Sequence, residues 1–128
     1  MDLSLDRPDA FLFVRRTAPG YVTVVDRNIE ASFLLAPDHM IEQWPAVDAA
    51  ALTPDLAAPF FDLQPELVLL GTGERQRFPP ADFLAAFLRR GVGIEVMDNA
   101  AAARTYDLLA GEGRRVVVGF ILPGAGAG

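Results

Sequence analysis

Cysteine and lysine are absent from this 128-residue chain, and histidine occurs once, as His39. The lack of cysteine excludes disulfides, thiol nucleophiles and iron–sulfur ligation, and it removes the thiolates that bind zinc in most structural sites. A lone histidine cannot form a His–His metal pair, and its position beside Pro37 and Asp38 is typical of a turn. We therefore expect neither a metal nor a cofactor.

Long hydrophobic runs are also missing. The apolar runs at residues 67–70 and 116–122 are far shorter than the roughly 20 residues that span a bilayer. Residues 1–6 lack the basic start and apolar core of a signal peptide. With 52% hydrophobic and 22% charged residues, the chain can bury a core. We expect one cytoplasmic domain over residues 1–128, with no membrane-spanning segment.

Basic charge is scarce and uneven. The net charge is −6, and residues 1–64 carry four Arg against ten acidic residues, while residues 65–128 carry seven of each. An acidic chain without a basic stripe repels nucleic acid and anionic membranes at long range. We therefore expect no nucleic-acid partner. If the chain binds another protein, the candidate contact surfaces are the loops at the carboxyl edge of the sheet and the acidic first half. That half would favour a basic partner.

The first half of the chain has the short apolar runs of strands. Runs at residues 11–14, 21–25, 32–35 and 40–44 alternate with turn residues at 18–20, 26–28 and 36–38, which predicts an antiparallel meander over about 10–46. Thr53 and Pro54 have the character of a helix start, and Pro59 is expected to weaken that helix.

The second half alternates strand and helix. We expect strands at residues 67–70, 93–97 and 115–122, a helix over 81–90, and a second helix from a cap at Asp98 to about residue 110. This pattern predicts a parallel βαβαβ unit over 65–122 with helices on both faces, and a frayed tail at 123–128. The strand at 116–122 should be central, because it is apolar on both faces. This pattern predicts the α/β class, with a mostly parallel sheet and the meander packed on one side or edge of it.

The glycines of Gly71-Thr72-Gly73 follow a predicted strand, where backbone N–H groups could approach a phosphate. No third glycine follows at the dinucleotide spacing, and no lysine follows as in a Walker loop. Three interpretations remain open, namely a structural tight turn, a loop that binds a small ligand and a nucleotide site.

Glu95 lies inside a strand that we expect to be covered on both faces, where an unpaired carboxylate would be costly. With Asp98 it could form an acid–base pair at the carboxyl edge of the sheet. Alternatively, Asp98 caps a helix and Glu95 pairs with an arginine or faces an exposed sheet edge. Arg104 and Asp107 have the spacing of a surface ion pair. The candidate ligand or partner cleft comprises Gly71, Thr72, Gly73, Glu95, Asp98, Asn99 and Arg104, with no catalytic residue assigned.

Four ordered segments resemble one protein family. They are residues 65–73 (PELVLLGTG), 91–98 (GVGIEVMD), 102–109 (AARTYDLL) and 112–116 (EGRRV), and Phe33, Pro37 and Trp44-Pro45 fit as well. The family is a small domain family of unknown function that includes the mitochondrial respiratory complex I assembly factor 3 and the adipogenesis-associated Mth-like domain protein. This chain departs from it at Asn99, where the family often has Thr, and at Asp107, where it often has Asn.

The resemblance implies a three-layer α/β domain of the Mth-like fold, with a mixed, mostly parallel central sheet and an additional antiparallel β layer. It assigns no reaction. It suggests a non-catalytic, protein-binding domain that helps to assemble a larger complex. The alternative is an enzyme or small-ligand-binding protein that uses the cleft at the carboxyl edge of the parallel strands.

Overall fold

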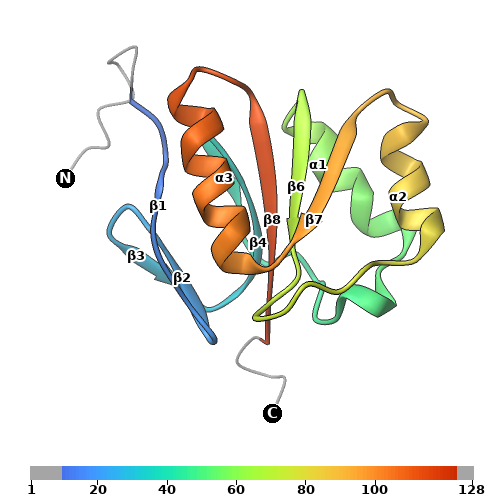
Figure 1. The fold of residues 1–128 in the computed structure, drawn as a ribbon, viewed down its shortest axis with the longest axis horizontal. Coiled ribbons are helices and arrows are strands. Elements are labelled where there is room, and N and C mark those ends of the chain that lie inside the picture. The colour runs from blue at the N-terminus through green and yellow to red at the C-terminus, as the bar shows by residue number, and fades with distance from the viewer. Residues whose placement is uncertain (1–9, 124–128) are drawn as a thin grey trace.

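A five-stranded sheet in the order β5-β4-β8-β6-β7 runs through the middle of the computed structural model, which describes residues 10–123 (Figure 1). A separate three-stranded sheet has the order β1-β2-β3. The strands are β1 (Val14–Ala18), β2 (Tyr21–Val24), β3 (Arg27–Ile29), β4 (Ala31–Ala36), β5 (His39–Ile41), β6 (Leu67–Gly71), β7 (Gly93–Met97) and β8 (Val116–Pro123). The helices are α1 (Ala58–Asp62), α2 (Ala81–Leu88) and α3 (Asn99–Gly111), with 3₁₀ turns at Ala49–Ala51 and Pro54–Ala57.

The central sheet is mixed. β6 pairs in parallel with both β7 and β8, whereas β4 pairs antiparallel with β8 and with β5. β8 is the third of the five strands, as its two apolar faces predict. The α/β class, the mixed sheet and the additional antiparallel β layer are therefore confirmed.

The antiparallel meander expected over residues 10–46 is divided between the two sheets. β1, β2 and β3 form it, but β4 and β5 join the central sheet because every residue of β4 after Ala31 is buried. The first strand begins at Val14 rather than at residue 11. The turn expected at residues 26–28 lies at Val25–Asp26 instead, where Val25 has φ +56°, and Arg27–Ile29 forms β3.

Each face of the central sheet carries its own core. Alternate residues of β8 point to opposite sides, so Val118 and Phe120 pack under α3 and the small sheet, while Val117 and Ile121 pack under α1 and α2. The two sides are visible in Figure 1, where α3 lies to the left of β8 and α2 lies to the right of β7. Helices thus cover both faces, as the sequence predicts.

The helical segment after residue 53 differs from expectation. Thr53 precedes the 3₁₀ turn but its side chain makes no capping hydrogen bond, and the chain continues past Pro59 as α1. Pro59 is tolerated because it occupies the first turn, where its missing N–H would have no helical partner. The predicted tail at 123–128 lies outside the described residues, apart from Pro123. None of the helices between residues 10 and 123 has both the length and the apolar character needed to cross a bilayer.

Substituting Gly119 of β8 with alanine tests the tight contact between the sheet and α1. An added Cβ would lie 2.6 Å from Cζ of Phe60, whose buried ring is held by Trp44 and Phe87 at centroid distances of 5.3 and 5.2 Å. We expect Gly119→Ala to lower the free energy of unfolding by about 1–3 kcal/mol. Chemical denaturation measures this, with Gly20→Ala as a control because its Cβ would meet no atom within 4 Å. Equal losses in both variants would contradict the prediction.

Candidate functional site

The loops after β6 and β7 meet at the carboxyl edge of the parallel strands, as right-handed crossovers require. The backbone N–H of Thr72 donates to Met97 O (3.0 Å), and the N–H of Asn99 donates to Gly73 O (2.8 Å). Five of the seven predicted cleft residues therefore lie together at this edge, namely Gly71, Thr72, Gly73, Asp98 and Asn99.

Asn99 is the polar centre of this edge and is only 6% exposed. Its Oδ1 accepts from the N–H of Gly73 (3.1 Å), and its Nδ2 donates to Ile121 O (3.0 Å). The side chain thereby joins the loop after β6 to β8. A Cβ on Gly71 would collide with this Oδ1, so glycine is needed there for close approach.

The hydroxyl of Thr72 closes the next part of the loop. It donates to Arg75 O (2.6 Å) and accepts from the N–H of Arg77 (3.0 Å). Between them, Gln76 Nε2 donates to Val96 O (2.8 Å) on β7. Because the N–H of Gly73 is already bonded to Asn99, these contacts favour the tight-turn interpretation of the glycines over a phosphate cradle.

Asp98 caps α3 as predicted, with Oδ1 accepting from the N–H of Ala101 (2.8 Å). The expectation that Glu95 lies in a strand covered on both faces is wrong, because β7 is an edge strand and Glu95 is exposed on it. Arg104 is exposed on α3 and forms no ion pair with Asp107, which instead accepts from the N–H of Val14 (2.8 Å). Neither Glu95 nor Arg104 lines the cavities at the carboxyl edge.

Two cavities open at this edge. One of about 220 Å³ lies between the β1–β2 hairpin and the start of α3, and its charged lining residues are Glu74 and Asp98. Two carboxylates make it unsuited to a phosphate. The second, of about 500 Å³, is lined by Glu74, Arg75 and Arg77 together with Thr72 and apolar residues near the end of β8. Among residues 10–123, no three His, Asp or Glu side chains converge to hold a metal ion.

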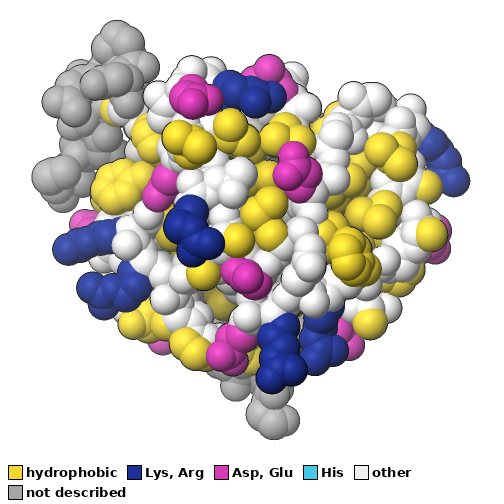
Figure 2. Space-filling view, viewed as in Figure 1, with side chains coloured by type: hydrophobic (Ala, Val, Ile, Leu, Met, Phe, Trp, Pro, Cys, Tyr) yellow, Lys and Arg dark blue, Asp and Glu magenta, His cyan; other side chains and the backbone are white. Residues whose placement is uncertain are grey.

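The outer side of α2 is apolar, a feature that our sequence analysis missed. Its eight residues include one polar side chain, Asp82. The buried Phe83 and Phe87 form the inner side, and the partly buried Leu84 and Ala86 pack against the same core. Hydrophobic side chains gather on the right of Figure 2, over the region of α2 and β7. The signal was present in the sequence, since a surface helix normally has a polar stripe and residues 81–88 lack one. We call Ala81, Ala85 and Leu88 the α2 face.

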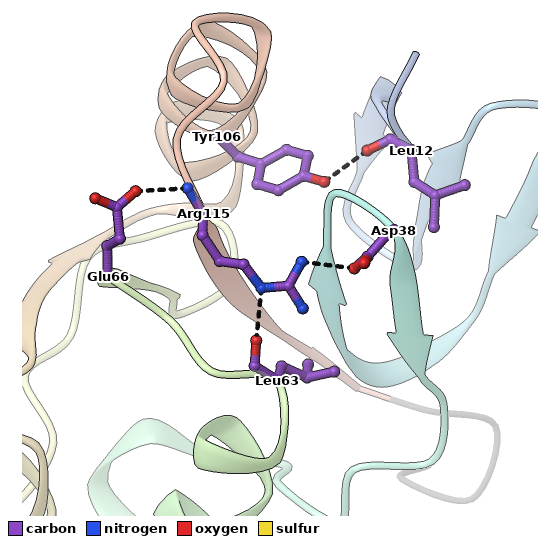
Figure 3. A network of polar contacts seen from close by, with 6 residues as sticks. All are labelled: Leu12, Asp38, Leu63, Glu66, Tyr106 and Arg115. Carbon is purple, nitrogen blue, oxygen red and sulfur yellow. Dashed lines mark hydrogen bonds and ion pairs between the residues drawn. The ribbon is translucent and has the colours of Figure 1, made fainter. Parts of the chain in front are cut away.

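A polar network holds the opposite edge of the sheet together (Figure 3). Arg115, at the start of β8, donates from Nε to Leu63 O (2.9 Å) and from Nη1 to Asp38 Oδ1 (2.7 Å). Its backbone N–H donates to Glu66 Oε1 (2.7 Å). One arginine thereby connects the end of α1, the β4–β5 turn and the approach to β6, which gives it a structural role.

Tyr106 of α3 is fully buried beside this network and donates its hydroxyl to Leu12 O (2.6 Å). Burial raises the pKa of this hydroxyl, and the carboxylate of Asp107 raises it further. The phenol therefore stays protonated and holds the segment before β1 against α3.

Replacing Asn99 with alanine tests how much its two side-chain hydrogen bonds at the carboxyl edge stabilise the fold. The change leaves the N–H of Gly73 and the carbonyl of Ile121 without their partner, at a cost of about 1–3 kcal/mol for each buried group. We expect the midpoint of urea unfolding to fall clearly in Asn99→Ala and to stay within error in Arg104→Ala, an exposed position on the same helix. An unchanged midpoint in Asn99→Ala would show that these two hydrogen bonds contribute little to the free energy of unfolding.

The environment of Asp107 predicts that the free energy of unfolding depends on pH. Burial raises its pKa above the ordinary value of 3.8, and the hydrogen bond from Val14 opposes the rise. The folded state thus binds the proton of the Asp107 carboxyl group more tightly than the unfolded chain does. The stability that the protonated group contributes is lost as pH rises through the raised pKa. Asparagine keeps an acceptor for Val14 without the buried charge.

We therefore expect Asp107→Asn to be more stable than the parent protein at neutral pH, with the advantage vanishing at and below pH 3.8. Denaturation curves of both proteins across this range measure the difference. A constant difference at all pH values would refute the assignment.

The chain is similar to proteins of one known family. Residues 14–121 match a family described as "Protein of unknown function (DUF498/DUF598)". NADH dehydrogenase (ubiquinone) 1 alpha subcomplex assembly factor 3 of Homo sapiens is 33% identical over 90 residues, covering 69% of this chain and 49% of that protein. The chain thus spans about half the length of this curated relative.

Solved structures agree with this match. A Xanthomonas campestris protein is 44% identical with a TM-score of 0.82, covering 98% of this chain and 95% of that one. A Bordetella pertussis protein described as a Mth938-like domain is 31% identical with a TM-score of 0.76, covering 88% and 87%. The family resemblance is therefore confirmed, and the chain belongs to the DUF498/DUF598 family and has the fold of the Mth938-like domain.

Proposed function

We propose that this protein is a non-catalytic domain that binds another protein through the α2 face and helps to assemble a larger complex. The observation that carries the proposal is the absence of a polar stripe on the outer side of α2. The relatives named as assembly factors support a role of this kind for the family.

The geometry of α2 explains why this face is available. Phe83 and Phe87 are one helical turn apart and point into the core, where both are fully buried. At about 100° per residue, Ala81, Ala85 and Leu88 then lie on the opposite side. Leu88 is 65% exposed, and Phe78, in the loop before the helix, is 68% exposed. A helix that is apolar all round is normally covered, which supports a partner here.

The contacts at the carboxyl edge of the sheet support a binding role rather than a catalytic one. The polar side chains of Thr72, Asp98 and Asn99 all hold backbone groups of the protein itself. A group that maintains a turn or caps a helix has little freedom to change partners during a reaction. Glu95, proposed as the second carboxylate of an acid–base pair, stands apart on the exposed edge strand.

The proposal is tested by purifying tagged protein and variants from the native cell at moderate salt. Fully burying one leucine contributes about 1.5–3 kcal/mol, so placing a charge at Leu88 should weaken the complex by roughly tenfold or more. We expect a stoichiometric protein to copurify with the parent protein and to be lost from Leu88→Asp.

Leu108→Asp is the matched control, since Leu108 is 62% exposed on α3, outside the α2 face. This variant should retain the partner, and both variants should keep the parent thermal unfolding midpoint. Copurification that survives Leu88→Asp, or no stoichiometric protein at all, would refute the proposal.

A further inference from the structure

The charge around α2 is opposite in sign to that of the protein as a whole. Residues 75–90 contain four Arg and one acidic residue, whereas the rest of the chain contains seven Arg and sixteen acidic residues. The four, which we call the arginine frame, are Arg75, Arg77, Arg89 and Arg90. In Figure 2, basic side chains lie below the hydrophobic cluster and at its right margin. Along the chain, two arginines therefore precede the α2 face and two follow it.

The first pair of arginines is held on a fixed loop. The Thr72 hydroxyl bonds the carbonyl of Arg75 and the N–H of Arg77, and Gln76 anchors the residue between them to β7. Both arginines are exposed and line the cavity of about 500 Å³. Within residues 10–123, neither guanidinium forms an ion pair. The loop thus presents two cations with little backbone entropy left to lose on binding.

The second pair lies at the other end of α2. Arg90 stacks over the ring of Phe61, with its Cζ 4.2 Å from the ring centroid, which fixes its position. Arg89 is exposed directly after Leu88. Since α2 has eight residues, it spans about 12 Å, so the apolar strip that separates the two pairs along the chain is about two turns long.

We propose that the α2 face binds an acidic amphipathic helix of the partner protein, with leucine-like side chains on the apolar strip and carboxylates on the arginine frame. This inference rests on the proposed function and adds the chemistry of the partner. It reverses the expectation from the acidic first half, which favoured a basic partner.

A helix fits this surface better than an added strand. In a strand, alternate backbone groups face opposite neighbours, so Ile94 and Val96 present the outward carbonyls of β7 that a new strand would need. Gln76 already occupies the carbonyl of Val96. On α2, the small Ala81 and Ala85 lie one turn apart and allow a second helix to approach closely.

The surface fits a protein segment better than an anionic membrane. A flat bilayer would extend past the arginine frame toward the rest of the chain, which carries sixteen acidic residues against seven Arg. The net charge outside residues 75–90 is strongly negative, and its repulsion of lipid acts over about 8 Å at physiological ionic strength. A narrow helix contacts only the local positive charge.

The first test compares Arg75→Glu/Arg77→Glu with the matched double variant Arg15→Glu/Arg16→Glu, whose exposed arginines lie on β1. The affinity for the copurified partner should fall roughly tenfold or more in the first variant, remain unchanged in the second, and weaken with salt in the parent protein. A partner that is lost from Leu88→Asp but retained by Arg75→Glu/Arg77→Glu would overturn the acidic chemistry and leave the proposed function standing.

The second test uses two synthetic helical peptides that share a leucine stripe and differ only in glutamate or lysine flanks. With ¹⁵N-labelled protein, we expect the glutamate peptide to shift the amide resonances of residues 75–90, and Arg75→Glu/Arg77→Glu to abolish these shifts. Equal or tighter binding of the lysine peptide, no binding of either up to millimolar concentration, or binding only to phosphatidylglycerol vesicles would overturn the proposal. If the glutamate peptide binds but no cellular protein copurifies, the surface chemistry stands and the assembly role fails.

Discussion

The burial of β8 on both faces is the constraint on which the rest of the structure depends. A strand that is apolar from Val116 to Leu122 is stable only with a layer on each side and a strand on each edge. The chain meets this need with α3 and the β1–β3 sheet on one face, α1 and α2 on the other, and β4 and β6 as neighbours. The division of the N-terminal strands between two sheets follows from it, because β4 must leave the meander to complete the central sheet.

The same architecture explains why the carboxyl edge, the usual ligand position in open α/β sheets, is occupied by the protein's own contacts. Backbone groups in the loops after β6 and β7 have few hydrogen-bond partners within the sheet. The side chains of Thr72, Asp98 and Asn99 supply these partners. Their donors and acceptors are consumed in building the edge. The surface that has no packing partner inside the protein is instead the apolar outer side of α2, because the core requires only the inner side of this helix.

Charge and position combine in a similar way. The overall acidity of the chain says little about any one segment, because residues 75–90 contain four Arg and one acidic residue in a chain of net charge −6. The partner that we propose would respond at close range to that local positive charge, since salt screens the more distant carboxylates.

The sequence alone determined the elements whose signals are local. The strand at Gly93–Met97, the cap at Asp98 and the apolar β8 were all predictable, because side-chain periodicity and capping involve residues within a few positions of each other. Only the tertiary structure decided that β7 is an edge strand, which leaves Glu95 in solvent, and that Asp107 bonds Val14 rather than Arg104. These outcomes depend on which distant segments pair, and strand pairing brings together residues whose separation along the chain carries no local signal.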